Sequence, residues 1–206
     1  PVALRVITRA GGHGFFMRAL EITNTSADRA LGLTSVTPLQ GMLWHMTDNL
    51  ADNLRDAGVP PFTLGRFTDI EWGQEGHFAW EDLPLNAEVS YGSRRGRSGH
   101  GHPFGIVRNN IYGGYFLCAL AWSANWRLAV ETVRLTQSAH LQFAARPEAM
   151  APLRVIAPGE TVSAPAVHFG LGHRDLDRTI QAWHTYLRAA VLRLAEYARV
   201  AVPRLA

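Results

Sequence analysis

The chain has 206 residues, of which 47% are hydrophobic and 18% are charged. This composition excludes an intrinsically disordered protein, and the length is sufficient for one large domain or two small ones with hydrophobic cores. All 20 basic residues are arginines, scattered rather than aligned in a stripe, and 17 acidic residues leave a formal net charge of only +3. We therefore expect no nucleic-acid partner.

No apolar stretch approaches the roughly 20 residues that are needed to cross a bilayer. The N-terminus has no charged-then-apolar signal pattern. We expect no membrane partner and favour a cytoplasmic location. The sequence begins at Pro1 directly before a strand-like run, residues 2–7, which leads us to expect a segment of a longer protein.

Most of the chain is predicted to form short antiparallel strands. Residues 15–22 and 126–133 alternate apolar and polar side chains, the pattern of strands with one buried face. The continuous apolar run 115–122 predicts a central strand buried on both faces, with Cys118 as a buried thiol. Residues 40–61 leave two alternatives open, a helical turn or two, or a strand followed by a loop. Many short strands with turns between them predict a sandwich or a barrel.

The hydrophobic period changes near the C-terminus. From Asp175 onward, apolar residues recur at intervals of three and four, which predicts one face of a long amphipathic helix. We expect Asp175 or Asp177 in its N-terminal turn and Trp183 and Leu187 buried against the sandwich. The apolar positions of this helix are Leu176, Ile180, Trp183, Leu187, Val191, Leu194 and Ala198.

A loop candidate for ligand binding lies at residues 91–104, which hold three arginines, two histidines and four glycines between two strand-like runs. Glycines let a backbone approach a ligand closely, and arginine forks bind oxygen-rich groups. We favour the alternative that Arg94, Arg95 and Arg97 pair with carboxylates, so that at least one contacts an Asp or Glu. His100 and His102 have the spacing of two ligands on one side of a strand, but a third ligand is missing, and we expect no metal.

A second candidate is a group of acidic residues around Trp72 and Trp80. Carboxylates beside aromatic rings suit a sugar site, but hydrolysis needs two carboxyls at a defined separation. The acids of this group are Asp69, Glu71, Glu75, Glu81 and Asp82. With Ile70 pointing inward, Asp69, Glu71 and Gln74 would lie on a solvated face, and we favour this interpretation.

Two weaker motifs also have ordinary interpretations. Ser98 and His100 lack the strand-turn-helix context of a hydrolase nucleophile. The Asn-Thr-Ser run at 24–26 fits N-glycosylation, but we favour a turn between strands.

Several segments, in their order along nearly the whole chain, resemble the N-terminal β-sandwich domain of α-galactosidases of glycoside hydrolase family 36, the melibiase group. The helix segment WHTYLR at 183–188 is similar to the family's connecting helix. The other segments are LEITNT at 20–25, WGQE at 72–75, RGRSGH at 95–100 followed by HPF at 102–104, SANW at 123–126 and IAPGE at 156–160. The sequence departs from the family's pattern at Gln74, Gly99, His102 and Ala124, positions that bear on substrate contacts more than on the fold.

The resemblance implies an all-β fold: a large antiparallel β-sandwich (a supersandwich, galactose-mutarotase-like) with a C-terminal α-helix. Residues 1–172 would form the sandwich domain, without its first strands, and residues 173–200 a connecting helix towards a (β/α)₈ catalytic barrel that this sequence does not include. In the family that barrel carries the two catalytic aspartates of a retaining glycosidase. We therefore expect no catalytic residue, no metal and no cofactor in this chain.

The resemblance also implies the partners. These are the chain's own catalytic barrel, galactoside sugars, and further copies of the enzyme in a homo-oligomer. Sandwich-domain loops of the family can reach the sugar site of a neighbouring subunit, the role that we carry over to Trp72. Arg95 and His100 are the other substrate-binding candidates.

Two alternatives stay open beside this interpretation. The chain is a free-standing carbohydrate-binding sandwich that uses Trp72, Trp80 and the loop 94–102, or it is a structural interaction domain whose exposed helix face binds a partner.

Overall fold

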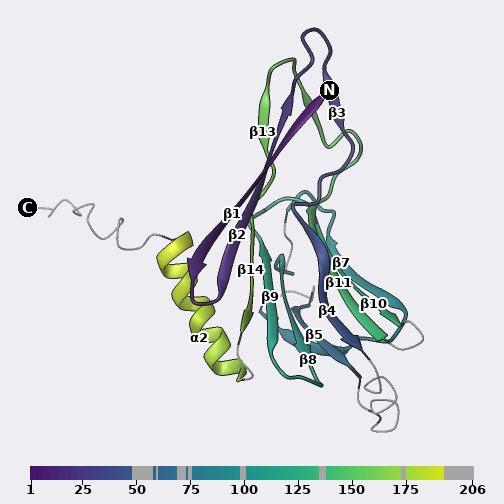
Figure 1. Ribbon diagram of the computed structural model, residues 1–206, viewed down its shortest axis with the longest axis vertical. Helices are drawn as coiled ribbons and strands as arrows, with labels where there is room; N and C mark the ends of the chain where they lie inside the picture. The colour runs from purple at the N-terminus through teal and green to yellow at the C-terminus, as the bar shows by residue number, and fades with distance from the viewer. Residues whose placement is uncertain are drawn as a thin grey trace, which may run out of the picture.

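The computed structural model describes residues 1–47, 58, 60–68, 73, 76–97, 101–134, 138–172 and 175–192. Within these ranges the strands form three sheets, and the chain then enters helix α2 (Leu176–Tyr186), which continues into a π-helical turn, Leu187–Val191 (Figure 1). This architecture confirms the prediction of an all-β sandwich with a C-terminal helix.

Eight strands form the main sheet, in the order β1-β2-β14-β9-β8-β5-β6 with β13 paired to β2. Four strands form the facing sheet, in the order β4-β11-β10-β7, and β12 pairs with β3. The strands are β1 Val2–Gly12, β2 Phe15–Asn24, β3 Leu31–Leu33, β4 Leu39–Thr47, β5 Phe62–Phe67, β6 Phe78–Asp82, β7 Ala87–Ser93, β8 Phe104–Asn109, β9 Tyr115–Leu120, β10 Trp126–Arg134, β11 Ser138–Pro147, β12 Arg154–Ile156, β13 Thr161–Ser163 and β14 Val167–Gly172.

The main hydrophobic core lies between the eight-stranded and four-stranded sheets. On β10 every second side chain is buried, beginning with Trp126, Leu128 and Val130, as the period-two pattern predicted. On the neighbouring β11, Leu141 and Phe143 point into the same core. The positions between them point away from the core and can carry polar side chains.

Strand β9 lies in the middle of the eight-stranded sheet and is buried on both faces, as predicted. Phe116 and Cys118 belong to the core between the sheets, whereas Leu117 belongs to a second cluster beneath α2. Burial raises the pKa of the Cys118 thiol well above its usual value, which leaves it an inert part of the core. Trp122 lies beyond the end of the strand and is exposed.

Helix α2 begins where the sequence predicted. The Asp175 carboxylate accepts a hydrogen bond from the backbone N–H of Arg178 at 3.1 Å and so caps the N-terminus. Trp183 is buried and Leu187 is half-buried, so the expected burial is confirmed for the first and partial for the second. Val191 is exposed, which shows that the apolar stripe leaves the sandwich there. In the described residues no helix is long and apolar enough to span a membrane.

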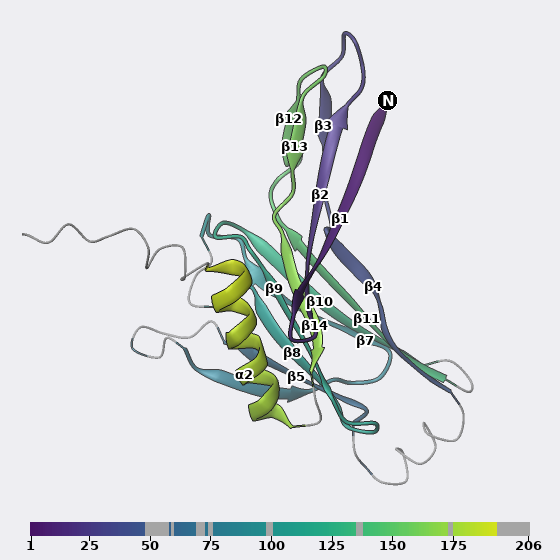
Figure 2. The same ribbon diagram turned by 60° about the vertical axis from the view of Figure 1, so that its left-hand side comes forward.

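Helix α2 lies against the outer face of the main sheet (Figure 2), and aromatic rings form the contact. The ring centroid of Trp183 lies 5.0 Å from that of Phe15 and 5.9 Å from that of Phe104. Tyr186 packs directly on the backbone of Gly11, where any side chain would collide with its ring. The helix is thus part of the folded unit, held by β1, β2 and β8.

A part-buried hydrogen bond adds a pH-sensitive group to this contact. His168 on β14 accepts from the Tyr186 hydroxyl at 2.6 Å when its Nδ1 is unprotonated, and burial lowers the pKa of His168. Because the unfolded chain binds a proton near pH 6.5 and the folded chain only at lower pH, the free energy of unfolding should decrease as the pH falls through about 6.5. Urea unfolding at pH 7.5 and 5.5 should show this loss, and His168→Gln should reduce it. A pH dependence that His168→Gln leaves unchanged, while His184→Ala changes it, would contradict this assignment.

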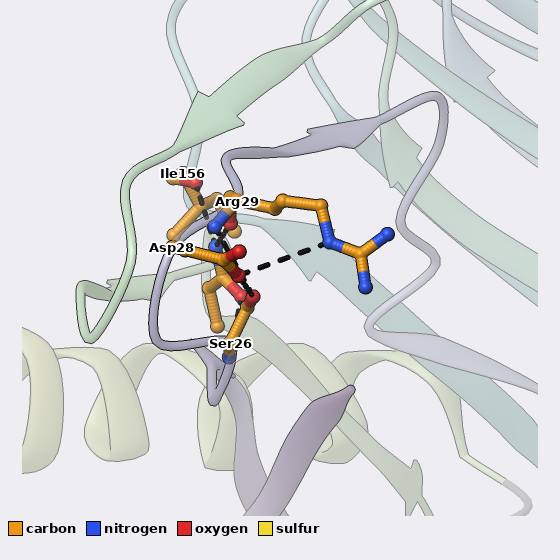
Figure 3. A network of polar contacts seen from close by, with 5 residues as sticks. Ser26, Asp28, Arg29 and Ile156 are labelled. Carbon is orange, nitrogen blue, oxygen red and sulfur yellow. Dashed lines mark hydrogen bonds and ion pairs between the residues drawn. The ribbon is translucent and has the colours of Figure 1, made fainter.

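The N-terminal part of β1 and the C-terminal part of β2, together with β3, β12 and β13, form an arm that extends beyond the sandwich (Figures 1 and 2). Asn24, the last residue of β2, is buried within this arm. Its Nδ2 donates to the carbonyls of Arg29 at 2.7 Å and Ile156 at 3.1 Å, and its Oδ1 accepts from the Ser26 N–H at 3.0 Å (Figure 3 shows this network). The Asn-Thr-Ser run is therefore a turn, as favoured, and its asparagine side chain is enclosed by the protein.

The ambiguous stretch 40–61 begins as a strand, β4, which favours the second of the two alternatives for its first part. Residues 48–57 lie outside the described part of the chain.

Candidate functional site

The arginine-rich loop begins where β7 ends, at the edge of the four-stranded sheet. Ser93 is buried and its hydroxyl donates to the carbonyl of Arg97, which closes the backbone into a tight bend. Gly96 lies within the bend at φ +76°, a conformation that side chains with a Cβ rarely adopt. The loop is thus shaped by its own hydrogen bonds and by glycine.

The first arginine of this loop pairs with a carboxylate. Arg94 Nη2 lies 2.7 Å from Glu148 Oε1, and this hydrogen bond lowers the pKa of the Glu148 carboxyl. Glu148 follows β11, and β7 and β11 both end beside Trp126 of β10, so the pair joins these two strands across β10 at one end of the four-stranded sheet. The expectation that at least one loop arginine contacts an acid is therefore confirmed.

The loop also contacts the segment SANW at 123–126. The backbone N–H of Gly96 donates to Asn125 Oδ1 at 2.6 Å, and the N–H of Glu148 donates to the Asn125 carbonyl at 2.9 Å. Two segments that carried the family resemblance, far apart in sequence, are thus joined by direct hydrogen bonds. Asn125 acts here as a structural organiser of the loop.

The three substrate-binding candidates have different positions relative to the described structure. Arg95 lies in the exposed bend after β7, next to the pair described above. Trp72 and His100 lie outside the described residues, as do Ser98, Asp69, Glu71 and Glu75. The sugar-binding role of Trp72, Arg95 and His100 therefore stays a prediction.

His102 and the remaining acids of the second candidate group have structural partners. The His102 ring meets Phe67 edge-on, with the centroids 4.8 Å apart. Glu81 pairs with Arg66 at 2.7 Å, and Asp82 accepts from the Thr63 hydroxyl at 3.3 Å. Both contacts of the acids join the neighbouring strands β5 and β6, which gives Glu81 and Asp82 a structural role. Asp69, Glu71 and Gln74, the residues expected on a solvated face, lie outside the described residues.

A groove that sequence reasoning missed lies between α2 and the outer face of β5, β6 and β8. Its volume is about 390 Å³ and its lining is mostly apolar. Trp80 lines it with 41% of its surface accessible, and Trp183 of α2 and Phe104 of β8 also line it. Phe67, Phe78 and Trp80 are close together in the sequence, but only the folded chain brings α2 next to them.

In the part of the chain that the structure describes, no three His, Cys, Asp or Glu side chains gather in a group that holds a metal ion. The arrangement around the arginine loop offers guanidinium donors and backbone N–H groups, but each described acid there is paired with an arginine. In the described residues, Arg94 and Gly96 of this loop join β7 to Glu148 and Asn125.

Comparisons with family models and with curated proteins find no match. Solved structures do match. The galactosidase domain of the α-galactosidase-sucrose kinase AgaSK has a TM-score of 0.70 and 18% sequence identity, over 91% of this chain and 24% of that one. The α-galactosidase from Lactobacillus brevis has a TM-score of 0.69 and 18% identity, over 91% of this chain and 23% of that one.

A variant of the GH36 α-galactosidase AgaA from Geobacillus stearothermophilus, in complex with raffinose, gives a TM-score of 0.70 and 16% identity, over 91% of this chain and 24% of that one. The present chain thus spans about a quarter of the length of these enzymes. At such identities the likeness is one of fold, and it confirms what the sequence motifs indicated: this chain has the fold of one domain of the GH36 α-galactosidases.

Proposed function

We propose that this chain is a non-catalytic sandwich domain of an α-galactosidase-like retaining glycoside hydrolase, where it supports the catalytic barrel and the oligomer interface. The observation that carries the proposal is the fold match over 91% of this chain to about a quarter of known α-galactosidases. The chemistry of such an enzyme needs two carboxyls across the anomeric carbon. In this proposal the barrel supplies both.

The described acids support a scaffold role. Glu81, Glu148 and Glu160 each form an ion pair with an arginine. The hydrogen bond from Arg94 lowers the pKa of Glu148, and hydrogen bonds from the Ala157 N–H and from Arg154 lower the pKa of Glu160. A general acid in a glycosidase needs a raised pKa instead.

Helix α2 supports the same proposal from the other end of the chain. Trp183 and Tyr186, in the last turns of α2, fix the helix to the sandwich, whereas Val191 and Leu192, just after these turns, are 38% and 50% exposed. Exposed apolar residues that follow the anchored turns suit a connection that packs on a following domain. In this proposal Trp72 reaches the sugar site of a neighbouring subunit, and Arg95 and His100 lie near that site.

The isolated chain should therefore not hydrolyse aryl α-galactosides above the buffer rate. Release of the aryl group is followed by absorbance, with circular dichroism as the check that the chain is folded. Saturable hydrolysis that is abolished by Glu71→Gln or Glu75→Gln would contradict the proposal, because it would place an active site in this chain.

The second candidate function is a free-standing carbohydrate-binding sandwich, and the exposed Trp80 at an apolar groove favours it. Titration of the isolated chain with galactose or melibiose separates the two functions. We expect no measurable binding, since the barrel would form most of the sugar pocket. Millimolar or tighter binding that is lost in Trp72→Ala and Arg95→Ala, with folding unchanged, would favour the binding module.

A further inference from the structure

Two histidines and a methionine lie together on the outer face of the four-stranded sheet. His45 on β4 lies opposite His140 on β11, and their Nδ1 atoms are 2.9 Å apart. The sulfur of Met42 lies 3.0 Å from the same His140 Nδ1. His140 Nδ1 thus lies within hydrogen-bond distance of two other atoms that carry lone pairs.

A β-bulge explains why these side chains share one face. Residues three apart on a regular strand point to opposite faces. On β4, however, Met42 pairs with Gln142 and Trp44 pairs with Leu141, so that one extra residue, at position 43, is inserted between them. This extra residue reverses the alternation and turns Met42 to the side of the histidines.

The inward neighbours show that this side is the outer one. Ala139, Leu141 and Phe143 are buried in the core between the sheets, so His140 between them points outward. Met42 is 57% exposed, and His45 is also exposed. The cluster is therefore accessible to an ion from solvent without any change in the core.

The His140 ring is oriented as a ligand ring would be. Its Nε2 lies 3.2 Å from the hydroxyl oxygen of Ser138. When Nε2 carries the proton and donates to that oxygen, Nδ1 keeps a free lone pair directed at the cluster. A ligating histidine is usually held by such a bond from its other ring nitrogen.

The distances suit a small ion with modest adjustment. Two nitrogens bound at about 2.0 Å to a tetrahedral ion lie roughly 3.3 Å apart, so the two rings need to separate by only a few tenths of an ångström. Imidazole binds copper, zinc and nickel, but a thioether sulfur selects Cu(I) among them. We propose that Met42, His45 and His140 form a Cu(I) site, a binding function beyond the proposed role in a glycosidase.

The test is an anaerobic competition for Cu(I) between the chain and the chromophoric chelator bicinchoninate, with ascorbate as reductant. We expect one Cu(I) per chain. His140→Ala should lower the affinity by more than about 100-fold, since loss of a direct ligand should exceed the 10- to 100-fold cost of losing an outer partner. Met42→Leu should lower it on the order of tenfold while Zn(II) binding stays unchanged, because zinc does not favour thioether ligands.

Matched controls are available in the same chain. Met150 is 91% exposed, so Met150→Leu should leave Cu(I) affinity unchanged, as should His184→Ala on the exposed side of α2. If His140→Ala loses its β-sheet spectrum, His45→Ala provides the same test. Cu(I) affinity that is equal in the wild type and either histidine variant, or that is unaffected by Met42→Leu, would overturn the proposed site.

Discussion

Replacement of Trp183 by alanine should cost about 3–5 kcal/mol of the free energy of unfolding. The indole is only 5% exposed and packs against Phe15, Phe104 and Tyr186, so its removal leaves a cavity between α2 and the sheet. For a chain of this length the melting temperature should fall on the order of 10 °C. Urea unfolding followed by circular dichroism measures the loss.

Two further variants make this prediction specific. Trp183→Phe keeps an aromatic ring in the cavity and should cost clearly less than alanine. Trp122 is 41% exposed, and Trp122→Ala should cost less than half as much as Trp183→Ala. An unchanged melting temperature in Trp183→Ala would show that the helix is only loosely attached, which would favour the structural interaction domain over the glycosidase domain.

Replacement of Asn24 by alanine should cost about 3 kcal/mol, since it leaves buried carbonyl groups and a backbone N–H without their partners. The side chain is 1% exposed and joins Arg29, Ile156 and Ser26 through three hydrogen bonds. Asn24→Asp should be at least as destabilising, although it has nearly the same shape, because a carboxylate would face the two carbonyl oxygens that now accept from Nδ2.

Ser26→Ala is the control in the same turn. Its hydroxyl contacts only exposed groups, the Asp28 carboxylate and the Arg29 N–H, so this variant should cost well under about 1 kcal/mol. Equal unfolding free energies for Asn24→Ala and Ser26→Ala would show that the buried network contributes little to stability.

The sequence predicted those elements whose pattern is uninterrupted. Residues 126–133 alternate without a break, and the stripe of α2 recurs regularly from Leu176 to Trp183, so both elements were found. The buried face of β10 was predicted, whereas on α2 the buried Thr179 and Tyr186 lie outside the predicted apolar stripe. Strand β4 stayed ambiguous for a physical reason: the bulge at position 43 reverses the alternation within it. The same bulge created the convergence of Met42 with His45, which no local pattern indicates.

The sequence predicted the type of contact at the candidate site, but not the residues that form it. A cluster of arginines near a sheet edge must find acids or ligands, and this reasoning anticipated the pairing of Arg94. It did not identify Glu148 as the partner, because the two residues are 54 positions apart and meet only through the order of strands β7, β10 and β11. The groove beside Trp80 was missed for the same reason, since its walls come from separate strands and from α2.

In the proposed function the sandwich supports an α-galactosidase whose catalytic residues lie in another domain. The most direct measurement compares this chain with the protein encoded by the complete reading frame that includes it, by titration with 1-deoxygalactonojirimycin, a compound found in complex with a variant of AgaA, and by assay with an aryl α-galactoside. We predict that the complete protein binds the compound and hydrolyses the substrate, and that the isolated chain, folded by circular dichroism, does neither. Binding and saturable turnover by the isolated chain, or a complete protein without α-galactosidase activity, would contradict the claim.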